Sequence, residues 1–176
     1  MRTSGTLLPA AVLAVAFAAM PARAQHTGDM LIAATVAGGG ALALGYDFAQ
    51  PVRTSLSFAG PTSSLFSTTN PGFDVLVAAG GGLHPLPSGV PVTLQITAVD
   101  AGVSLKIGTV TLDAVGATRL LGTTPDIHLH PSWQLVLPNG TTATRSVSFR
   151  LTTTASGFAA SAAYTATLTN QPATTT

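Results

Sequence analysis

The chain contains no cysteine and no glutamate among its 176 residues. The absence of cysteine excludes disulfide bonds, thiolate metal sites and a cysteine nucleophile, so the protein must fold by burial of apolar surface alone. Charged residues make up only 7% of the chain. Because nucleic-acid binding depends on clusters of Lys and Arg that neutralise phosphates, this sparse charge argues against a nucleic-acid partner.

Long apolar runs are also scarce. The longest, residues 7–20, has about 14 residues and is too short to span a bilayer. Arg2 precedes this run, and Pro21-Ala22-Arg23-Ala24 after it has the small-x-small pattern of a signal-peptidase site. We therefore expect residues 1–24 to be a cleavable signal peptide, the protein to be exported to the periplasm or the extracellular space, and no membrane span in the mature chain. Five basic and six acidic residues would then remain, a net charge of −1 with histidine neutral.

Short runs with alternating apolar and polar residues fill the rest of the chain, separated by Gly, Pro and Asn. No stretch has the sustained 3.6-residue period of an amphipathic helix. The pattern predicts a single all-β domain over residues 25–170, a β-sandwich of immunoglobulin-like or jelly-roll type, with residues 171–176 as a disordered tail. The predicted strands are residues 30–36, 41–48, 52–58, 73–79, 92–99, 103–112, 133–137, 143–153 and 164–168.

Two turns predict hairpins in the second half of the domain. The turn at residues 100–102 ends in glycine and predicts a hairpin between the strands on either side of it. Asn139-Gly140 is the strongest short hairpin dipeptide, because both residues tolerate the positive φ of a type I′ turn. It predicts a second hairpin, between strands 133–137 and 143–153.

The pair His128 and His130 is the clearest chemical pattern. On a strand the two side chains project from the same face, with Cα atoms about 6.5–7 Å apart, so both rings can bind one ion at about 2.0–2.1 Å. Asp126 would share this face, as a ligand or as a group that orients a ring, while Ile127 and Leu129 would face the core. The same pattern also fits two polar residues on the solvated face of an edge strand, and both interpretations stay open at this point.

A metal site needs at least one further ligand, and His26 and His84 are the remaining imidazoles. His26 would be the second residue of the mature chain, where its ring and the α-amine together suit copper or zinc. His84 lies in a proline-containing loop and is expected to be exposed. The predicted metal ligands are therefore His26, His128 and His130, with zinc or copper as the cofactor.

Motifs of enzymes are missing. The sequence has no Gly-x-Ser-x-Gly elbow, no His-Glu-x-x-His helix and no phosphate-binding glycine loop with its lysine. The six Asp residues show no pairing that would indicate a glycosidase. We therefore expect a protein that is not an enzyme, and we expect Trp133 to be a core residue.

Four short segments resemble a group of exported bacterial β-sandwich proteins, some surface-anchored and some regulated by a zinc repressor. The segments are Gln25-His26-Thr27-Gly28-Asp29, Asn70-Pro71-Gly72-Phe73-Asp74, His128-Leu129-His130-Pro131-Ser132-Trp133, and the closing stretch from Ser156 to Asn170. The resemblance covers most of the mature chain through short motifs only. It implies export, a β-sandwich, zinc handling and a role for His26, His128 and His130. The expected C-terminal sorting helix is missing, which argues against surface anchoring.

Two functions follow as expectations. The first is an exported module that binds a transition metal, zinc foremost, through clustered histidines. The second is a structural or surface-interaction protein without a metal site, whose Thr- and Ser-rich sheet faces meet other proteins or glycans.

Overall fold

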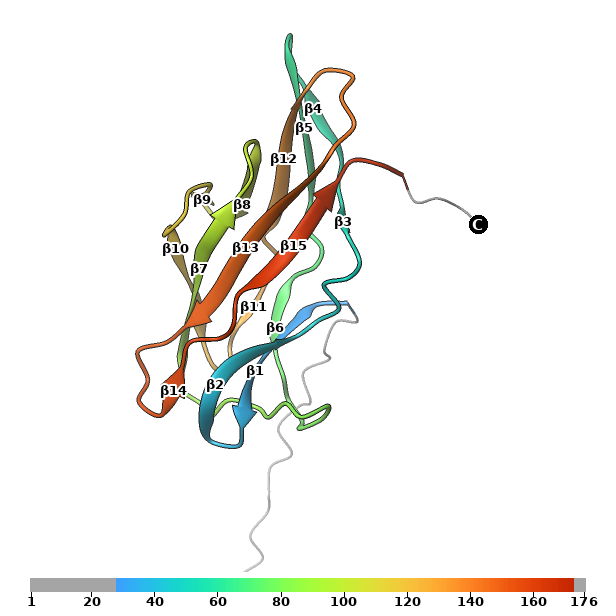
Figure 1. The fold of residues 1–176 in the computed structure, drawn as a ribbon. Helices are drawn as coiled ribbons and strands as arrows, with labels where there is room; N and C mark the ends of the chain where they lie inside the picture. The colour runs from blue at the N-terminus through green and yellow to red at the C-terminus, as the bar shows by residue number, and fades with distance from the viewer. Residues whose placement is uncertain (1–27, 173–176) are drawn as a thin grey trace, which may run out of the picture.

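The computed structural model describes residues 28–172. The predicted signal peptide, His26 and residues 173–176 of the predicted tail lie outside the described residues. Within residues 28–172 the regular structure is entirely β-strand, as the sequence predicts (Figure 1). The strands are β1 (Met30–Val36), β2 (Gly39–Gly45), β3 (Val52–Arg53), β4 (Ser55–Ala59), β5 (Ser63–Thr68), β6 (Phe73–Val75), β7 (Pro91–Val99), β8 (Val103–Ile107), β9 (Val110–Leu112), β10 (Thr118–Thr123), β11 (His128–Leu129), β12 (Ser132–Pro138), β13 (Thr144–Thr152), β14 (Phe158–Ala159) and β15 (Tyr164–Thr169).

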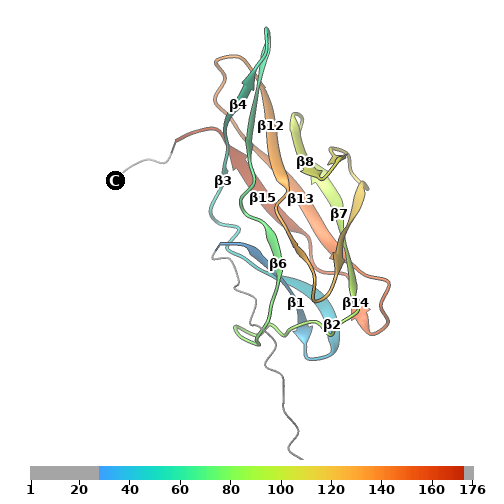
Figure 2. The ribbon, with the colours of Figure 1, turned by 180° about the vertical axis from the view of Figure 1, so that it is seen from behind.

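The strands form three five-stranded sheets. Two of them, with the orders β10-β7-β13-β15-β3 and β4-β5-β12-β8-β9, make the long body of the molecule. The third, β11-β6-β1-β2-β14, lies at one end of this body, where β1 and β2 are seen at the bottom of Figures 1 and 2. Together the sheets make an all-β, sandwich-like fold. Within residues 28–172 there is no helix of the length and hydropathy needed to cross a membrane.

Alternation of apolar and polar residues explains how the two long sheets are held together. In β7 the side chains of Val92, Leu94 and Ile96 are at most 1% exposed, while the residues between them are half-buried. In β13, Val147, Phe149 and Leu151 are completely buried in the same way. A strand with this period has one apolar face, and burial of that face against the facing sheet supplies the main stabilising free energy.

Both hairpin predictions are wrong. Strand β7 pairs with β10 and β13, whereas β8 pairs with β12 and β9, so the turn at residues 100–102 carries the chain from one sheet to the other. Likewise, the Asn139-Gly140 turn joins β12 to β13, which belong to different sheets. Gly102 and Gly140 have positive φ, but Asn139 does not, so the type I′ turn expected at Asn139-Gly140 is not formed. A turn dipeptide fixes a reversal of the chain, but it does not decide whether the next strand pairs with its predecessor or crosses to the facing sheet.

A cluster of aromatic side chains joins the three sheets. Phe73 on β6, Trp133 on β12 and Phe149 on β13 are each completely buried. The Phe149 ring centroid lies 5.9 Å from that of Phe73 and 6.1 Å from that of Trp133. Trp133 is thus a core residue, as predicted, and this aromatic cluster holds the small sheet against the two long ones.

Candidate metal site

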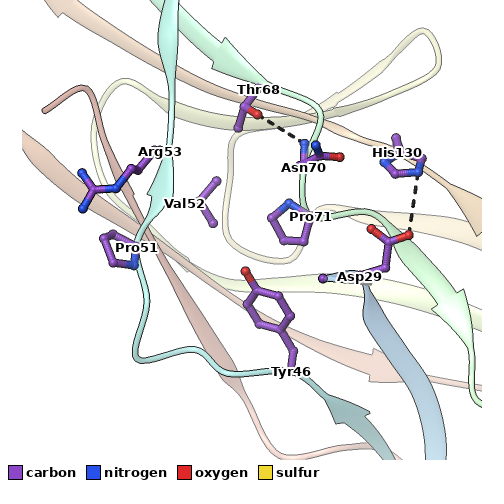
Figure 3. A pocket seen from close by; sticks show the side chains of 10 residues that line it. Asp29, Tyr46, Pro51, Val52, Arg53, Thr68, Asn70, Pro71 and His130 are labelled. Atoms are coloured by element: carbon purple, nitrogen blue, oxygen red, sulfur yellow. Dashed lines mark hydrogen bonds and ion pairs between the residues drawn. The ribbon is translucent and has the colours of Figure 1, made fainter. Parts of the chain in front are cut away.

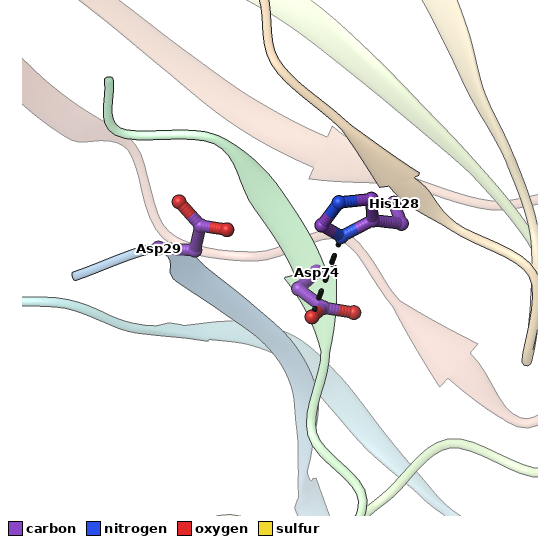
Figure 4. A group of neighbouring side chains, drawn as sticks. All are labelled: Asp29, Asp74 and His128. Carbon is purple, nitrogen blue, oxygen red and sulfur yellow. Dashed lines mark ion pairs between the residues drawn. The ribbon is translucent and has the colours of Figure 1, made fainter. Parts of the chain in front are cut away.

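Three segments far apart in the sequence meet at the small sheet. Asp29 directly precedes β1, Asp74 is the middle residue of β6, and His128 begins β11. Strand β6 lies between β1 and β11, and its register places Asp74 opposite both Leu31 and His128. Sheet pairing therefore brings the three side chains together (Figure 4). One donor atom from each of Asp29, Asp74 and His128 lies within 4.8 Å of the others.

His130 adds a fourth donor beside this group. Its Nε2 lies 3.8 Å from Oδ2 of Asp29, while Nδ1 of His128 lies 3.5 Å from Oδ2 of Asp74. Two ligands of a tetrahedral zinc ion, each about 2.0–2.1 Å from the metal, lie about 3.3 Å apart. Both nitrogen–oxygen distances are longer than a good hydrogen bond and close to the spacing of two ligands on one ion.

The two carboxylates are buried, and each forms an ion pair with a histidine. The side chains of Asp29 and Asp74 are only 4% and 6% exposed, and among residues 28–172 neither forms an ion pair with Lys or Arg. Oδ1 of Asp29 accepts a hydrogen bond of 2.8 Å from the Gly72 amide, and Oδ1 of Asp74 accepts one of 2.7 Å from the Val75 amide. Buried charge is costly unless it is paired or coordinates a metal.

The second oxygen of Asp29 is the unusual atom of the cluster. Oδ2 is fully buried and accepts no hydrogen bond from the described residues. It lies 3.8 Å from Nε2 of His130, and Nδ1 of the same ring lies 3.1 Å from the backbone oxygen of Thr69. A carbonyl oxygen only accepts, so Nδ1 is the donor and a neutral ring carries its lone pair on Nε2. Either a proton on Nε2 or a cation between the two atoms would satisfy Oδ2 of Asp29.

Gly72 is required by the close packing around these donors. A Cβ atom at this position would lie 2.8 Å from Cε1 and Nδ1 of His130 and 3.0 Å from Oδ1 of Asp29. The adjacent carbonyl of Pro71 accepts a hydrogen bond of 2.8 Å from Nε1 of Trp133, which fixes the loop to the core. The loop at residues 70–72 is therefore part of the wall of the cluster.

A pocket of about 470 Å³ opens beside the cluster on the side of Asp29 and His130. Figure 3 shows these two residues on one side of the pocket, with Pro51, Val52 and Arg53 on the other and Tyr46 below. The pKa of Tyr46 is raised, first by burial of the phenol and then by the negative charges of Asp47 and Asp29. The phenol therefore stays protonated at neutral pH and can donate a hydrogen bond.

The structure brings together only some of the residues singled out in the sequence. The rings of His128 and His130 lie side by side, with centroids 5.3 Å apart, and Ile127 is buried as expected. Asp126 is exposed and is not a member of the donor group. The backbone of His84 pairs with that of Ala34, toward the other end of β1, so this imidazole is not the third ligand. His26 lies outside the described residues, and its role stays a prediction.

Asp29 and Asp74 were not singled out in the sequence as members of this donor group. Both stand in the short segments that carry the family resemblance, but 45 residues separate them and 54 separate Asp74 from His128. No local spacing rule links positions so distant; only the pairing of β1, β6 and β11 does. Comparison with protein families, curated proteins and solved structures finds no match, so the resemblance stays a prediction.

Proposed function

We propose that this protein is an exported module that binds a divalent transition-metal ion, zinc foremost. Asp29, Asp74 and His128 hold the ion, and His130 is the fourth ligand. Neutral imidazole suits zinc, copper, iron and nickel, and two carboxylates neutralise the charge of a divalent ion. The single observation that carries the proposal is the donor group of Asp29, Asp74 and His128, whose ligand atoms all lie within 4.8 Å of one another.

Zinc titration by calorimetry tests the proposal directly. We expect Asp29→Asn and the double variant His128→Ala/His130→Ala to weaken zinc binding by at least about 100-fold, because each removes ligands of the ion. His84→Ala is the matched control, since this histidine lies elsewhere on the small sheet, and it should leave the affinity unchanged. His26→Ala in the same titration decides whether the N-terminal imidazole contributes. Equal zinc affinity in the native protein and in the double variant would refute the proposal.

The stability of the metal-free protein separates this site from a purely structural group of His–Asp ion pairs. Asp29→Asn keeps an oxygen that can accept from the Gly72 amide and removes the buried charge. If Asp29 contributes to metal binding and not to the stability of the fold, the metal-free variant should be at least as stable as the metal-free native protein. If instead the His130–Asp29 contact stabilises the fold, the variant should lose about 3 kcal/mol or more in urea unfolding.

A second candidate function, protein–protein interaction, is favoured by the edge strand β4. All five of its residues are exposed, none is charged, and Leu56 and Phe58 are 58% and 65% exposed. An open, uncharged and partly apolar edge is a template for pairing with another chain. This proposal predicts self-association or a retained partner in light scattering and pull-down experiments. Leu56→Ser/Phe58→Ser should abolish it, and a native protein that is strictly monomeric and without partners would contradict it.

A further inference from the structure

We propose that Asn139 is a site of spontaneous deamidation, and that conversion of its side-chain amide to a carboxylate releases the turn between β4 and β5. The Asn139-Gly140 dipeptide does not form the expected hairpin, and its contacts lie instead with another turn. In Figures 1 and 2 the loop from β12 to β13 lies beside the β4–β5 turn at the top of the molecule. The proposal depends on neither metal binding nor self-association.

Asn139 binds the backbone of the β4–β5 turn at three successive residues. Its side-chain Nδ2 donates to the carbonyl oxygens of Gly60 and Pro61, at 3.0 and 3.2 Å, and its backbone N–H donates to that of Thr62, at 3.2 Å. Oδ1 of Asn139 accepts a hydrogen bond of 2.7 Å from the hydroxyl of Ser64, a buried residue of β5. These partners fix the orientation of the amide, since carbonyl oxygens only accept and the hydroxyl can donate. One residue therefore holds the two turns together.

The residue after Asn139 makes its amide reactive. Glycine has no side chain to obstruct its own backbone nitrogen, so the nitrogen of Gly140 can attack Cγ of Asn139. A bond forms between these two atoms, the side-chain amide leaves as ammonia with the proton of the Gly140 N–H, and a succinimide ring results. Water then opens the ring at either carbonyl and leaves aspartate or isoaspartate at position 139.

The hydrogen bonds of the folded protein should slow this reaction without preventing it. Rotation of the Asn139 side chain toward the Gly140 nitrogen breaks the bonds from Nδ2 to the β4–β5 turn and the bond from Ser64 to Oδ1. Asn139 and Gly140 are both exposed, so water is available and local opening of the loop suffices. Deamidation should therefore proceed through a rare open state of the two turns.

The product cannot make the same contacts. A carboxylate has no N–H, so the carbonyl oxygens of Gly60 and Pro61 lose their donor and face a negative charge. Isoaspartate in addition lengthens the backbone between β12 and β13. Because β4 is the exposed edge proposed as an interaction surface, release of its turn would change that surface.

Peptide mapping by mass spectrometry tests the reactivity. The native protein is incubated at mildly alkaline pH, folded or unfolded in urea, and conversion of amide to acid is followed at Asn139 and Asn170. We expect Asn139 to react faster than Asn170 in urea, and at least about tenfold more slowly in the folded protein than in urea, because only the open state reacts. Ser64→Ala should speed the reaction in the folded protein by roughly two- to tenfold, the worth of one hydrogen bond. Ser63→Ala is the matched control, because its hydroxyl does not bind Asn139.

Hydrogen exchange measured by nuclear magnetic resonance tests the release of the turn, with Asn139→Asp as the aspartate product. The amide of Gly60 donates to the backbone oxygen of Ser63 within this turn. We expect it to exchange at least about tenfold faster in the variant, while the amides of β7 and β13 keep their native rates, because the opening is local.

Asn170→Asp is the matched control for the loss of a side-chain amide. Asn170 binds the backbone of Thr141 and Ala143, so this variant should leave the Gly60 amide protected. Equal deamidation rates at Asn139 in the folded and the unfolded protein, or no reaction in urea, would overturn the proposed site. Native exchange of the Gly60 amide in Asn139→Asp would overturn the release of the turn.

Discussion

Two side-chain clusters lie next to each other in this protein, and they differ in whether all their polar groups have hydrogen-bond partners. The aromatic cluster of Phe73, Trp133 and Phe149 is closed: its rings contact one another, and the indole nitrogen donates to Pro71. The neighbouring cluster of Asp29, Asp74, His128 and His130 has two buried carboxylates, each in an ion pair with a histidine. It also has one buried oxygen without a hydrogen bond from the described residues.

This difference suggests different roles for the two clusters: the aromatic cluster in stability and the polar cluster in binding. The aromatic cluster needs nothing beyond the chain itself, so it should carry the stability of the fold. In the polar cluster, Oδ2 of Asp29 has no hydrogen bond from the described residues, and a bound cation would satisfy it. Strand β6 belongs to both, since Phe73 is part of the first and Asp74 of the second. Four measurements test whether the two clusters have these different roles.

The largest effect is expected from Trp133→Ala. Loss of the completely buried indole leaves a cavity where the three sheets meet and leaves the Pro71 carbonyl without its donor. We expect a loss of about 3–5 kcal/mol in the free energy of unfolding, measured by urea denaturation. Leu120→Ala, at an exposed position of β10, should change stability by less than about 0.5 kcal/mol. A Trp133 variant as stable as the Leu120 variant would contradict the role given to the aromatic cluster.

Zinc itself should give the next largest effect. At a free concentration of about 100 times its Kd, an ion that binds only the folded protein adds about 2.7 kcal/mol to the free energy of unfolding. For a domain of this size the melting temperature should rise by about 5–10 °C, which scanning calorimetry measures. The double variant Asp74→Asn/His128→Ala should show no rise. If the native protein has the same melting temperature with zinc and with a chelator, the metal-binding role given to the polar cluster is contradicted.

A smaller effect is expected from Gly72→Ala. The added methyl group would displace the ring of His130 and the carboxylate of Asp29, so zinc affinity should fall by about 10–100-fold. Gly80→Ala is the matched control, because a Cβ there meets no atom within 4 Å. Calorimetric titration of both variants provides the test. Equal affinities would mean that the donors need not keep the positions described for Asp29 and His130.

The smallest effect concerns Tyr46. Its pKa is raised by burial and by the charges of Asp47 and Asp29, so an ion bound to Asp29 should lower it again. A raised pKa means that the folded protein keeps a proton that the unfolded chain releases, so stability is lost as the pH rises above about 10. Ultraviolet titration of the phenols with and without zinc measures the change. Tyr46→Phe should abolish the zinc-dependent change in the titration curve. If the change persists in this variant, it does not come from Tyr46.

Most of the strand-forming segments could be predicted from local pattern, but several boundaries and pairings could not. Predicted strand 30–36 has the same bounds as β1, and predicted strand 92–99 differs from β7 by a single residue. By contrast, β5 and β10 were missed. Serine and threonine interrupt the apolar period in the first, and the exposed Leu120 and Gly122 interrupt it in the second.

The same distinction applies to the candidate site. The His128–Leu129–His130 spacing predicted two rings side by side, because alternation along a strand is a local property. The carboxylates of Asp29 and Asp74 could not be predicted as their partners, because their proximity depends on which strands pair and in what register. The sequence also left open whether His128 and His130 face solvent alone or a set of further donors.

By itself, the sequence determined the all-β class, the apolar faces of the long strands and the pairing of two imidazoles, since each depends on residues a few positions apart. Only the tertiary structure decided that the turns at residues 100–102 and 139–140 cross between sheets, and that β6 places Asp74 between Asp29 and His128. The physical reason is that hydrogen-bonded strand pairing is non-local: a backbone amide can pair with any strand, and the packing of the whole core selects which one.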